Sequence, residues 1–262
     1  MQHIQFDDVS VDYDVVGSGD HVALLHAPPF VSWYEPLVAA LPGYSVLRYR
    51  RTLPPDRCDF DLGDDADVCA RLLHHVGFDH PHVVGHSYGG CLALELARRQ
   101  IVALRSIALL EPATSGLLDP EEAIAGLAPL MELYDSRGPA VATAQFLRLV
   151  LGNDARSLLD RFVPAAFDDA VACSDQFFRV ELPAIAHWSF GPDDASRVDR
   201  PILNVLGAES GVRFVQAAEI IQTLFPQASR FVLPGAGHLL MAQNPAGIAE
   251  RLDEFWRHRP AS

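Results

Sequence analysis

The sequence has few basic residues, few cysteines and no long uncharged apolar run. Its 262 residues include 20 Lys+Arg against 34 Asp+Glu, which gives a formal net charge of −14 at pH 7. A nucleic-acid partner is disfavoured, because no basic patch is present to neutralise phosphates and release their counterions. An anionic membrane surface is disfavoured for the same reason.

The 4 cysteines, Cys58, Cys69, Cys91 and Cys173, form no C-x-x-C pair, and no cysteine–histidine cluster has zinc-ligand spacing. We expect free thiols in a reducing compartment, with no metal and no cofactor. Residues 1–14 lack the basic start and apolar stretch of a secretory signal, and no uncharged apolar window reaches about 18 residues. These absences predict a soluble, cytoplasmic protein.

Apolar residues are abundant, at 49% of the chain, and they follow a regular order. Short apolar or alternating segments typical of strands are followed by segments with helical spacing. The expected strands are 4–6, 9–16, 22–26, 44–49, 82–85 and 104–110, and the expected helices are 33–41, 61–75 and 88–99. This alternation predicts a mostly parallel sheet with helices on both faces.

Between residues 112 and 200 the alternation stops and the pattern becomes mostly helical. It resumes with expected strands at 201–206 and 230–233 and expected helices at 214–224 and 246–256. We therefore interpret the chain as a single α/β domain, 1–262, with a helical cap inserted at 112–200.

The strongest chemical signal is the segment 82–90, HVVGHSYGG, which contains G-x-S-x-G between an expected strand and an expected helix. A serine on so sharp a turn needs strained backbone angles, and Gly85 and Gly89 remove Cβ atoms that would collide across it. Ser87 is the predicted nucleophile, lying at a helix N-terminus that would favour a developing oxyanion.

A serine nucleophile requires a general base, and 11 histidines are available. His238 is the predicted base, because it ends a glycine-rich loop between the last expected strand and the last expected helix. His86 is expected to point away from the nucleophile. The others near the motif are expected to be solvated: His74, His75, His80 and His82.

Together these features resemble the α/β-hydrolase superfamily. The order H-x-x-P, G-x-S-x-G, helical lid, G-x-G-H spans nearly the whole chain, and the segments HVVGHSYGG, ALLEPA and VLPGAGHLL resemble small bacterial α/β-fold serine hydrolases of undefined substrate. The resemblance implies an eight-stranded, mostly parallel twisted sheet, helices on both faces and a helical cap.

The acid that orients the histidine departs from the family pattern. The family places an aspartate at the end of P-x-L-x-x-x-G-x-x-D, where this chain has Ser210. Two substitutes remain open. Glu111, which ends the apolar run before Pro112, is the predicted orienting acid, because some members of the superfamily carry the acid at that strand end. Glu209 is the alternative.

The loop expected to form the oxyanion hole also departs from the family pattern. One donor is the backbone N–H of Tyr88, and the family takes the second from the third residue of an H-G-x-P loop. Here the loop is His26-Ala27-Pro28-Pro29, and Pro28 has no N–H. Ala27 is the predicted second donor; Phe30, a side chain, or a hole with a single donor are the alternatives.

Candidate walls of a substrate pocket come from this loop and from the cap. They are His26, Pro28, Phe30, Trp33, Phe178 and Trp188. The predicted function is cleavage of an ester, thioester or lactone of a small to medium apolar substrate by a monomer or homodimer. The alternatives are C–C bond hydrolysis, perhydrolysis or a lyase step on the same fold, and a non-catalytic ligand receptor.

Overall fold

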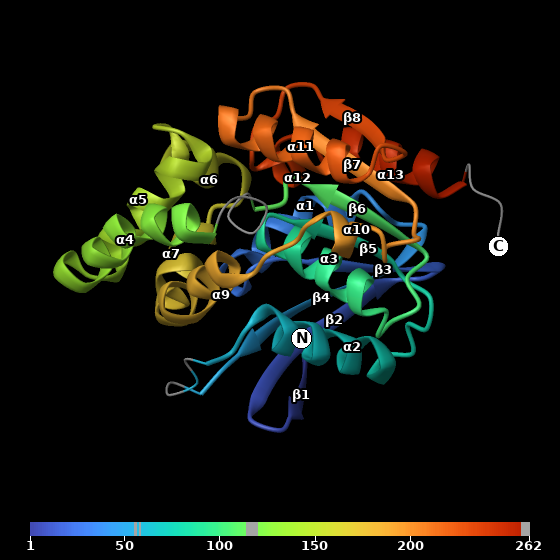
Figure 1. Cartoon of the computed structure of the whole chain (residues 1–262), viewed down its shortest axis with the longest axis horizontal. Coiled ribbons are helices and arrows are strands. Elements are labelled where there is room, and N and C mark those ends of the chain that lie inside the picture. The colour runs from blue at the N-terminus through green and yellow to red at the C-terminus, as the bar shows by residue number, and fades with distance from the viewer. Residues whose placement is uncertain (55–56, 58, 114–119, 258–262) are drawn as a thin grey trace.

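The computed structural model describes residues 1–54, 57, 59–113 and 120–257. Cys58 and the first part of the expected cap, 114–119, lie outside the described residues. The centre of the molecule is a sheet of 8 strands in the order β1-β2-β4-β3-β5-β6-β7-β8 (Figure 1). The strands are β1 Gln2–Phe6, β2 Val9–Gly17, β3 Asp20–Leu25, β4 Tyr44–Thr52, β5 His82–His86, β6 Ser106–Leu110, β7 Ile202–Gly207 and β8 Ser229–Leu233.

The direction of the strands follows the sequence pattern. Strands β1 and β2, whose residues alternate between apolar and polar, pair antiparallel with each other, and β2 pairs antiparallel with β4. From β4 to β8 all pairs are parallel. Strands β5, β6 and β7 are buried along their whole length, as expected for parallel strands covered on both faces.

Strand β5 identifies the helices on each face, because successive side chains point to opposite faces. The His82 ring stacks on Trp256 of α13 (Pro245–Arg257), with ring centroids 4.7 Å apart. A Cβ on Gly85 would lie 2.2 Å from the Gly89 carbonyl of α3 (Tyr88–Arg99). Helices α13 and α3 therefore cover opposite faces. The expected solvation of His82 is wrong, because the side chain is buried and bonded to Ser106 Oγ at 2.7 Å.

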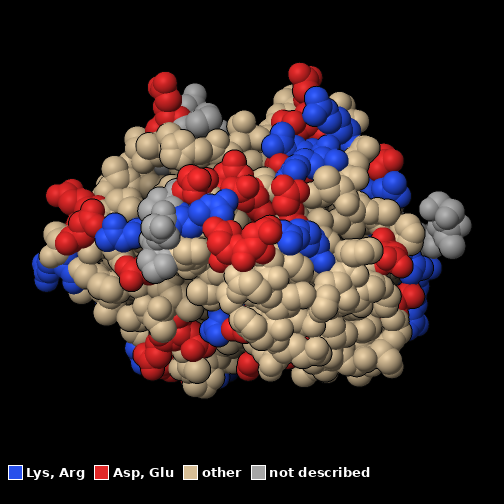
Figure 2. Space-filling model, turned by 90° about the horizontal axis from the view of Figure 1, so that it is seen from below, with Lys and Arg blue, Asp and Glu red and all other residues tan. Residues whose placement is uncertain are grey.

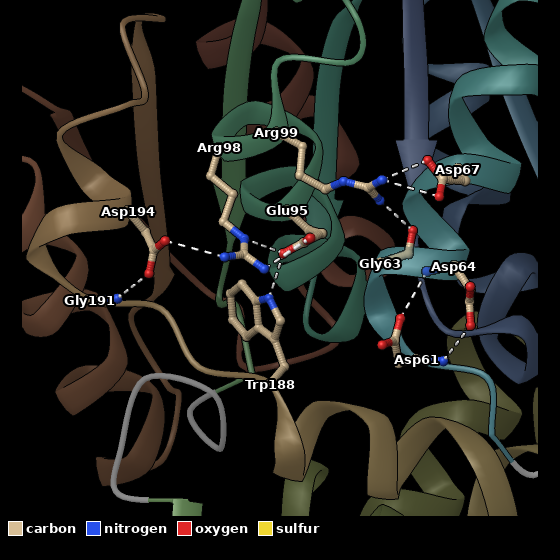
Figure 3. A network of polar contacts seen from close by, with 10 residues as sticks. All are labelled: Asp61, Gly63, Asp64, Asp67, Glu95, Arg98, Arg99, Trp188, Gly191 and Asp194. Carbon is tan, nitrogen blue, oxygen red and sulfur yellow. Dashed lines mark hydrogen bonds and ion pairs between the residues drawn. The ribbon is translucent and has the colours of Figure 1, made fainter.

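The remaining core helices are close to the expected segments. The expected helix 33–41 is divided into a 3₁₀ turn, η1 (Pro28–Tyr34), and α1 (Glu35–Ala39). Helix α2 (Leu62–His75) starts at a capping box in which Asp61 and Asp64 each accept a backbone N–H from the other residue (Figure 3). In chain order, α11 (Val212–Leu224) follows β7, and α12 (Leu240–Gln243) precedes α13.

The described part of the segment between β6 and β7 is helical and adds no strand to the sheet. We call residues 120–187 the insertion, which gathers at one side of the sheet (Figure 1). Its elements are α4 Pro120–Arg137, α5 Pro139–Leu151, α6 Ala155–Phe162, α7 Ala166–Ala172, α8 Ser174–Gln176, the π-helical η3 Phe177–Glu181, and α9 Leu182–His187. A short helix, α10 (Pro192–Ala195), returns the chain to β7.

Charges of both signs are mixed over the surface. Figure 2 shows acidic and basic side chains lying beside one another on one face. Arg57 contacts Asp8 and Asp59, and Arg71 contacts Asp7, so the excess acidic charge is partly paired. Among the described residues, no helix is both long and apolar enough to cross a membrane.

Candidate active site

Ser87 lies on a strained turn between β5 and α3. Its φ of 53° and ψ of −116° fall in a region that residues with a side chain rarely adopt. The turn is possible because a Cβ on Gly89 would lie 2.0 Å from the Leu25 carbonyl oxygen at the end of β3. The missing Cβ therefore lets the start of α3 approach the loop after β3, and Ser87 is half-buried at this point.

Glu111 and His238 meet at the same edge of the sheet. His238 Nδ1 donates to Glu111 Oε2 at 2.7 Å, and both side chains are almost fully buried. Glu111 Oε1 accepts the Gly207 N–H at 2.7 Å and the Ser210 hydroxyl at 2.5 Å. The φ of Glu111 is 47°, so this residue too has an unusual backbone. Three donors, from His238, Gly207 and Ser210, thus fix the position of this buried carboxylate.

The second candidate acid lies elsewhere. Glu209 has an exposed side chain, and among the described residues Glu111 is the one carboxylate bonded to His238. Ser210, which stands where the family has its aspartate, instead donates to Glu111. The two positions are thus linked, because Ser210 donates its hydroxyl to the carboxylate of Glu111, the residue that follows β6.

Two residues that hold His238 were missed by sequence reasoning. His86 Nε2 bonds the His238 backbone oxygen at 2.9 Å, and the two rings lie 4.4 Å apart. Burial, and then the charge of His238, lowers the pKa of His86 well below its usual value, so a neutral His86 donates its proton to that oxygen. His86 therefore points toward the loop that carries His238.

Phe214 is the second residue that packs against the His238 ring. Its ring stacks on His238 with centroids 3.9 Å apart and planes 14° apart. The sequence did contain a signal for this position. Phe214 is in the first turn of α11, the helix that follows β7, and residues just after a parallel strand lie at the edge of the sheet where the site forms.

The expected oxyanion donors are Tyr88 and Ala27. Among the described residues the Ala27 N–H has no acceptor, whereas the Phe30 N–H donates to the Ala27 oxygen at 3.0 Å. The Phe30 N–H therefore already has an acceptor, whereas the Ala27 N–H is free to donate to an oxyanion. His26 Nδ1 also bonds the Ala27 oxygen, at 2.6 Å, and burial lowers the pKa of His26 to about 4. A neutral His26 thus fixes the loop from inside the protein.

Aromatic side chains of the loop meet the insertion above this edge. Phe30 lies 4.7 Å from Trp33, 6.1 Å from Phe146 and 5.4 Å from Phe177, measured between ring centroids. Phe178 does not take this position, because it is fully buried and stacks on Tyr134 inside the insertion. Phe177 is the residue of that pair that contacts the loop.

Trp188 lies at the junction between the insertion and α3. Its Nε1 donates to the buried Glu95 at 2.7 Å, and Arg98 binds both oxygens of the same carboxylate while also reaching Asp194 (Figure 3). The indole is thereby anchored to the helix that starts at the elbow. This contact gives Trp188 a structural role that the sequence did not indicate.

No group of three or more His, Cys, Asp or Glu side chains in the described part of the chain is arranged to hold a metal ion. The order of the strands, with a serine elbow between β5 and α3, defines the α/β-hydrolase fold. The chain belongs to the alpha/beta hydrolase family, whose model matches residues 17–251.

Two curated relatives are distant in sequence. The chain is 27% identical over 208 residues to a pimeloyl-[acyl-carrier protein] methyl ester esterase of Aromatoleum aromaticum, covering 75% of this chain and 76% of that protein. It is 24% identical over 193 residues to a probable alcohol acetyltransferase of Saccharomyces cerevisiae. That match covers 67% of this chain but only 56% of the yeast protein.

Solved structures share the fold over nearly the whole chain. The enol-lactonase from Burkholderia xenovorans superposes with a TM-score of 0.83 at 17% identity, covering 98% of this chain and 100% of that one. A thermophilic esterase from Thermogutta terrifontis superposes with a TM-score of 0.80 at 18% identity, covering 98% of both chains. These likenesses show that the chain has the α/β-hydrolase fold over nearly its whole length.

Proposed function

We propose that the protein is a serine hydrolase that cleaves an ester, thioester or lactone through an acyl-enzyme on Ser87. The observation that carries the proposal is the buried bond from His238 Nδ1 to Glu111, at the edge of the sheet where Ser87 has the strained elbow conformation. This bond leaves Nε2 of the same ring as the atom that can accept a proton, which is what a general base requires.

In the proposed reaction Ser87 Oγ attacks the substrate carbonyl carbon while His238 Nε2 takes the hydroxyl proton. The backbone N–H groups of Tyr88 and Ala27 bind the resulting oxyanion. His238 then gives its proton to the departing alcohol or thiol, which leaves the acyl group on Ser87. A water, deprotonated by the same nitrogen, releases the acid and restores the serine. The ionised Glu111 stabilises the imidazolium in both halves.

We propose that the insertion is a cap over this edge and that the substrate is small to medium-sized and apolar. The aromatic contacts of Phe30 with Phe146 and Phe177 support both statements, because they place apolar side chains of the insertion against the oxyanion loop. The two sequence relatives are named as a methyl ester esterase and a probable alcohol acetyltransferase, and both of these activities involve an ester.

A fluorophosphonate probe tests the nucleophile directly. We expect the native protein and Ser136→Ala, which removes an exposed hydroxyl, to be labelled equally and Ser87→Ala not at all, with the adduct located by peptide mass spectrometry. A panel of chromogenic esters of increasing acyl length then defines the substrate. A folded native protein that neither labels nor cleaves any ester would overturn the proposal in favour of non-ester chemistry or a receptor.

A further inference from the structure

A buried arginine joins the insertion to the elbow. Arg51, in β4, is 2% exposed. Its Nη2 lies 2.9 Å from Asp65 Oδ2 of α2, 3.5 Å from Glu181 Oε1 of η3, and 3.0 Å from the Tyr88 hydroxyl, to which it donates. Tyr88 in turn donates to Asp65 at 2.9 Å. Tyr88 is the residue directly after the nucleophile, so the insertion contacts the elbow through one shared cation.

Gln176 provides a second link to the same place. Its Nε2 donates to Glu181 Oε1 at 2.7 Å and to the Arg51 backbone oxygen at 3.3 Å. Its Oε1 accepts the Leu53 N–H at 2.9 Å. The segment 176–181 is therefore held to the end of β4 by hydrogen bonds to backbone groups as well as by charge.

The charges in this cluster do not balance when both carboxylates are ionised. Asp65 and Glu181 are each 0% exposed and share one guanidinium, and Glu181 Oε2, Asp65 Oδ1 and Arg51 Nε have no hydrogen-bond partner among the described residues. Burial raises the pKa of Glu181 to about 7, more than Arg51 lowers it. Burial raises the pKa of Asp65 as well. A proton on Glu181 makes the cluster neutral, and burying a neutral cluster costs less than burying a net charge.

We propose that Gln176 and Glu181 are positioning residues that hold the insertion against the nucleophile elbow through Arg51. We call this contact between segment 176–181 and β4 the seat, and a proton on Glu181 stabilises it. Loss of the proton leaves two buried carboxylates on one arginine and favours separation of segment 176–181 from β4. Any effect of this opening on turnover, through the Tyr88 N–H, rests on the proposed function. The contact between segment 176–181 and β4 does not depend on it.

Other titratable groups around Glu181 are part of the same environment. Those that face the cluster are Arg51 and Tyr49 of β4, Asp65 of α2, Tyr88 of α3, and Cys173 just before α8. Burial raises the pKa of Tyr49 and Tyr88 well above the usual value and that of Cys173 in the same direction. These three groups stay protonated near neutral pH, which leaves the two carboxyl groups, and of these Glu181 has the pKa of about 7.

The size of the effect follows from linkage. If Glu181 is solvated when the seat opens, its pKa returns to the ordinary 4.5 from about 7 in the closed seat. The equilibrium constant for opening then rises about tenfold per pH unit between these two values and levels off above the higher one. Between pH 5 and 7 the opening constant should therefore rise about fortyfold.

Amide hydrogen exchange of segment 173–187 measures this opening without any substrate. After correction for the intrinsic pH dependence of exchange, we expect the native protein to show the rise up to pH 7 and the plateau above it. Glu181→Gln, which keeps an oxygen to accept from Gln176, should show a flat profile. Glu95→Gln is the matched control, because Glu95 is also buried and also joins α3 to a residue after the insertion, Trp188 (Figure 3). It should keep the native pH dependence.

The proposal is overturned if native protein and Glu181→Gln have the same pH dependence, or if Glu95→Gln loses it. Should Glu181→Gln fail to fold, Gln176→Met gives a second test: it should increase opening by a similar factor at every pH while keeping the rise. Because exchange needs no turnover, an unreactive Ser87 would overturn the proposed function and leave this result standing. For an active enzyme, kcat of native protein relative to Glu181→Gln should fall between pH 6 and 8.

Discussion

Ser87 and Glu111 share a backbone property that separates them from nearly all other residues with side chains. Their φ angles are 53° and 47°, and only Asp7 and Gln100 among other described non-glycine residues have positive φ. Asp7 lies in the β1–β2 turn and Gln100 caps α3, where such angles are ordinary. Ser87 and Glu111 instead both follow parallel strands at the edge of the sheet where the site forms, and such backbone strain is typical of functional residues.

The choice of acid gives a prediction at this scale. Glu111→Gln should lower kcat by about 10³- to 10⁴-fold, because an amide no longer stabilises the imidazolium or fixes the tautomer of His238. Glu209→Gln, with an exposed side chain, should stay within about twofold of native. Steady-state kinetics on the best ester of the panel measures both. Near-native turnover of a folded Glu111→Gln would remove Glu111 from the mechanism.

At the scale of elements, helix α3 connects the site to the rest of the molecule. Its first residue belongs to the elbow, Arg99 binds Asp67 and the Gly63 oxygen of α2, and Glu95 with Arg98 holds Trp188 (Figure 3). The helix is thus fixed on one side to the core and on the other to the end of the insertion. Any movement of the insertion is limited by these contacts.

The indole hydrogen bond can be tested with a matched pair of tryptophans. Trp188→Phe removes a donor to a buried carboxylate, whereas the Trp256 indole nitrogen is buried without a partner among the described residues. We expect Trp188→Phe to lower the free energy of unfolding by about 1.5–3 kcal/mol more than Trp256→Phe does. Chemical denaturation measures the difference. Equal losses in the two variants would show that the bond to Glu95 contributes nothing net.

At the scale of the whole molecule, buried ionisable groups make stability depend on pH in two opposite ways. A raised carboxyl pKa, as in Glu181, means that the folded state binds more protons than the unfolded state, so stability falls as pH rises toward 7. A lowered histidine pKa has the reverse sign, because the folded state then binds fewer protons. Stability from such a histidine is present above pH 6.5 and is lost as pH falls toward 4.

His82 allows the histidine contribution to be measured away from the site. Burial lowers its pKa from 6.5 to about 4, which corresponds to about 3 kcal/mol of stability lost between these pH values. In His82→Asn, whose amide can still bond Ser106, the fall in unfolding free energy between pH 6.5 and 4 should be smaller by about that amount. His74→Gln, at an exposed position, should keep the native slope. An unchanged slope in His82→Asn would contradict the prediction.

The sequence by itself determined the alternation of strands and helices, the place of the insertion, the serine at the elbow and the histidine in the last loop. These features are local, because hydrophobic periodicity and a turn flanked by glycines depend only on neighbouring residues. The boundaries of the strands and of the longer core helices could therefore be read from the chain within a few residues, whereas the separate helices of the insertion could not. The 3₁₀ turn at 28–34 was missed because two prolines break the helical spacing there.

Only the tertiary structure decided which carboxylate contacts His238, that His86 and Phe214 hold its ring, and that Glu181 shares Arg51 with Asp65. Each contact joins residues far apart in the chain, and each depends on which way a side chain points where a strand or helix ends. A shift of one residue would turn that side chain to the other face, so spacing alone left Glu111 and Glu209 both open. Burial, which sets the pKa of Glu181, is likewise a property of the packed molecule.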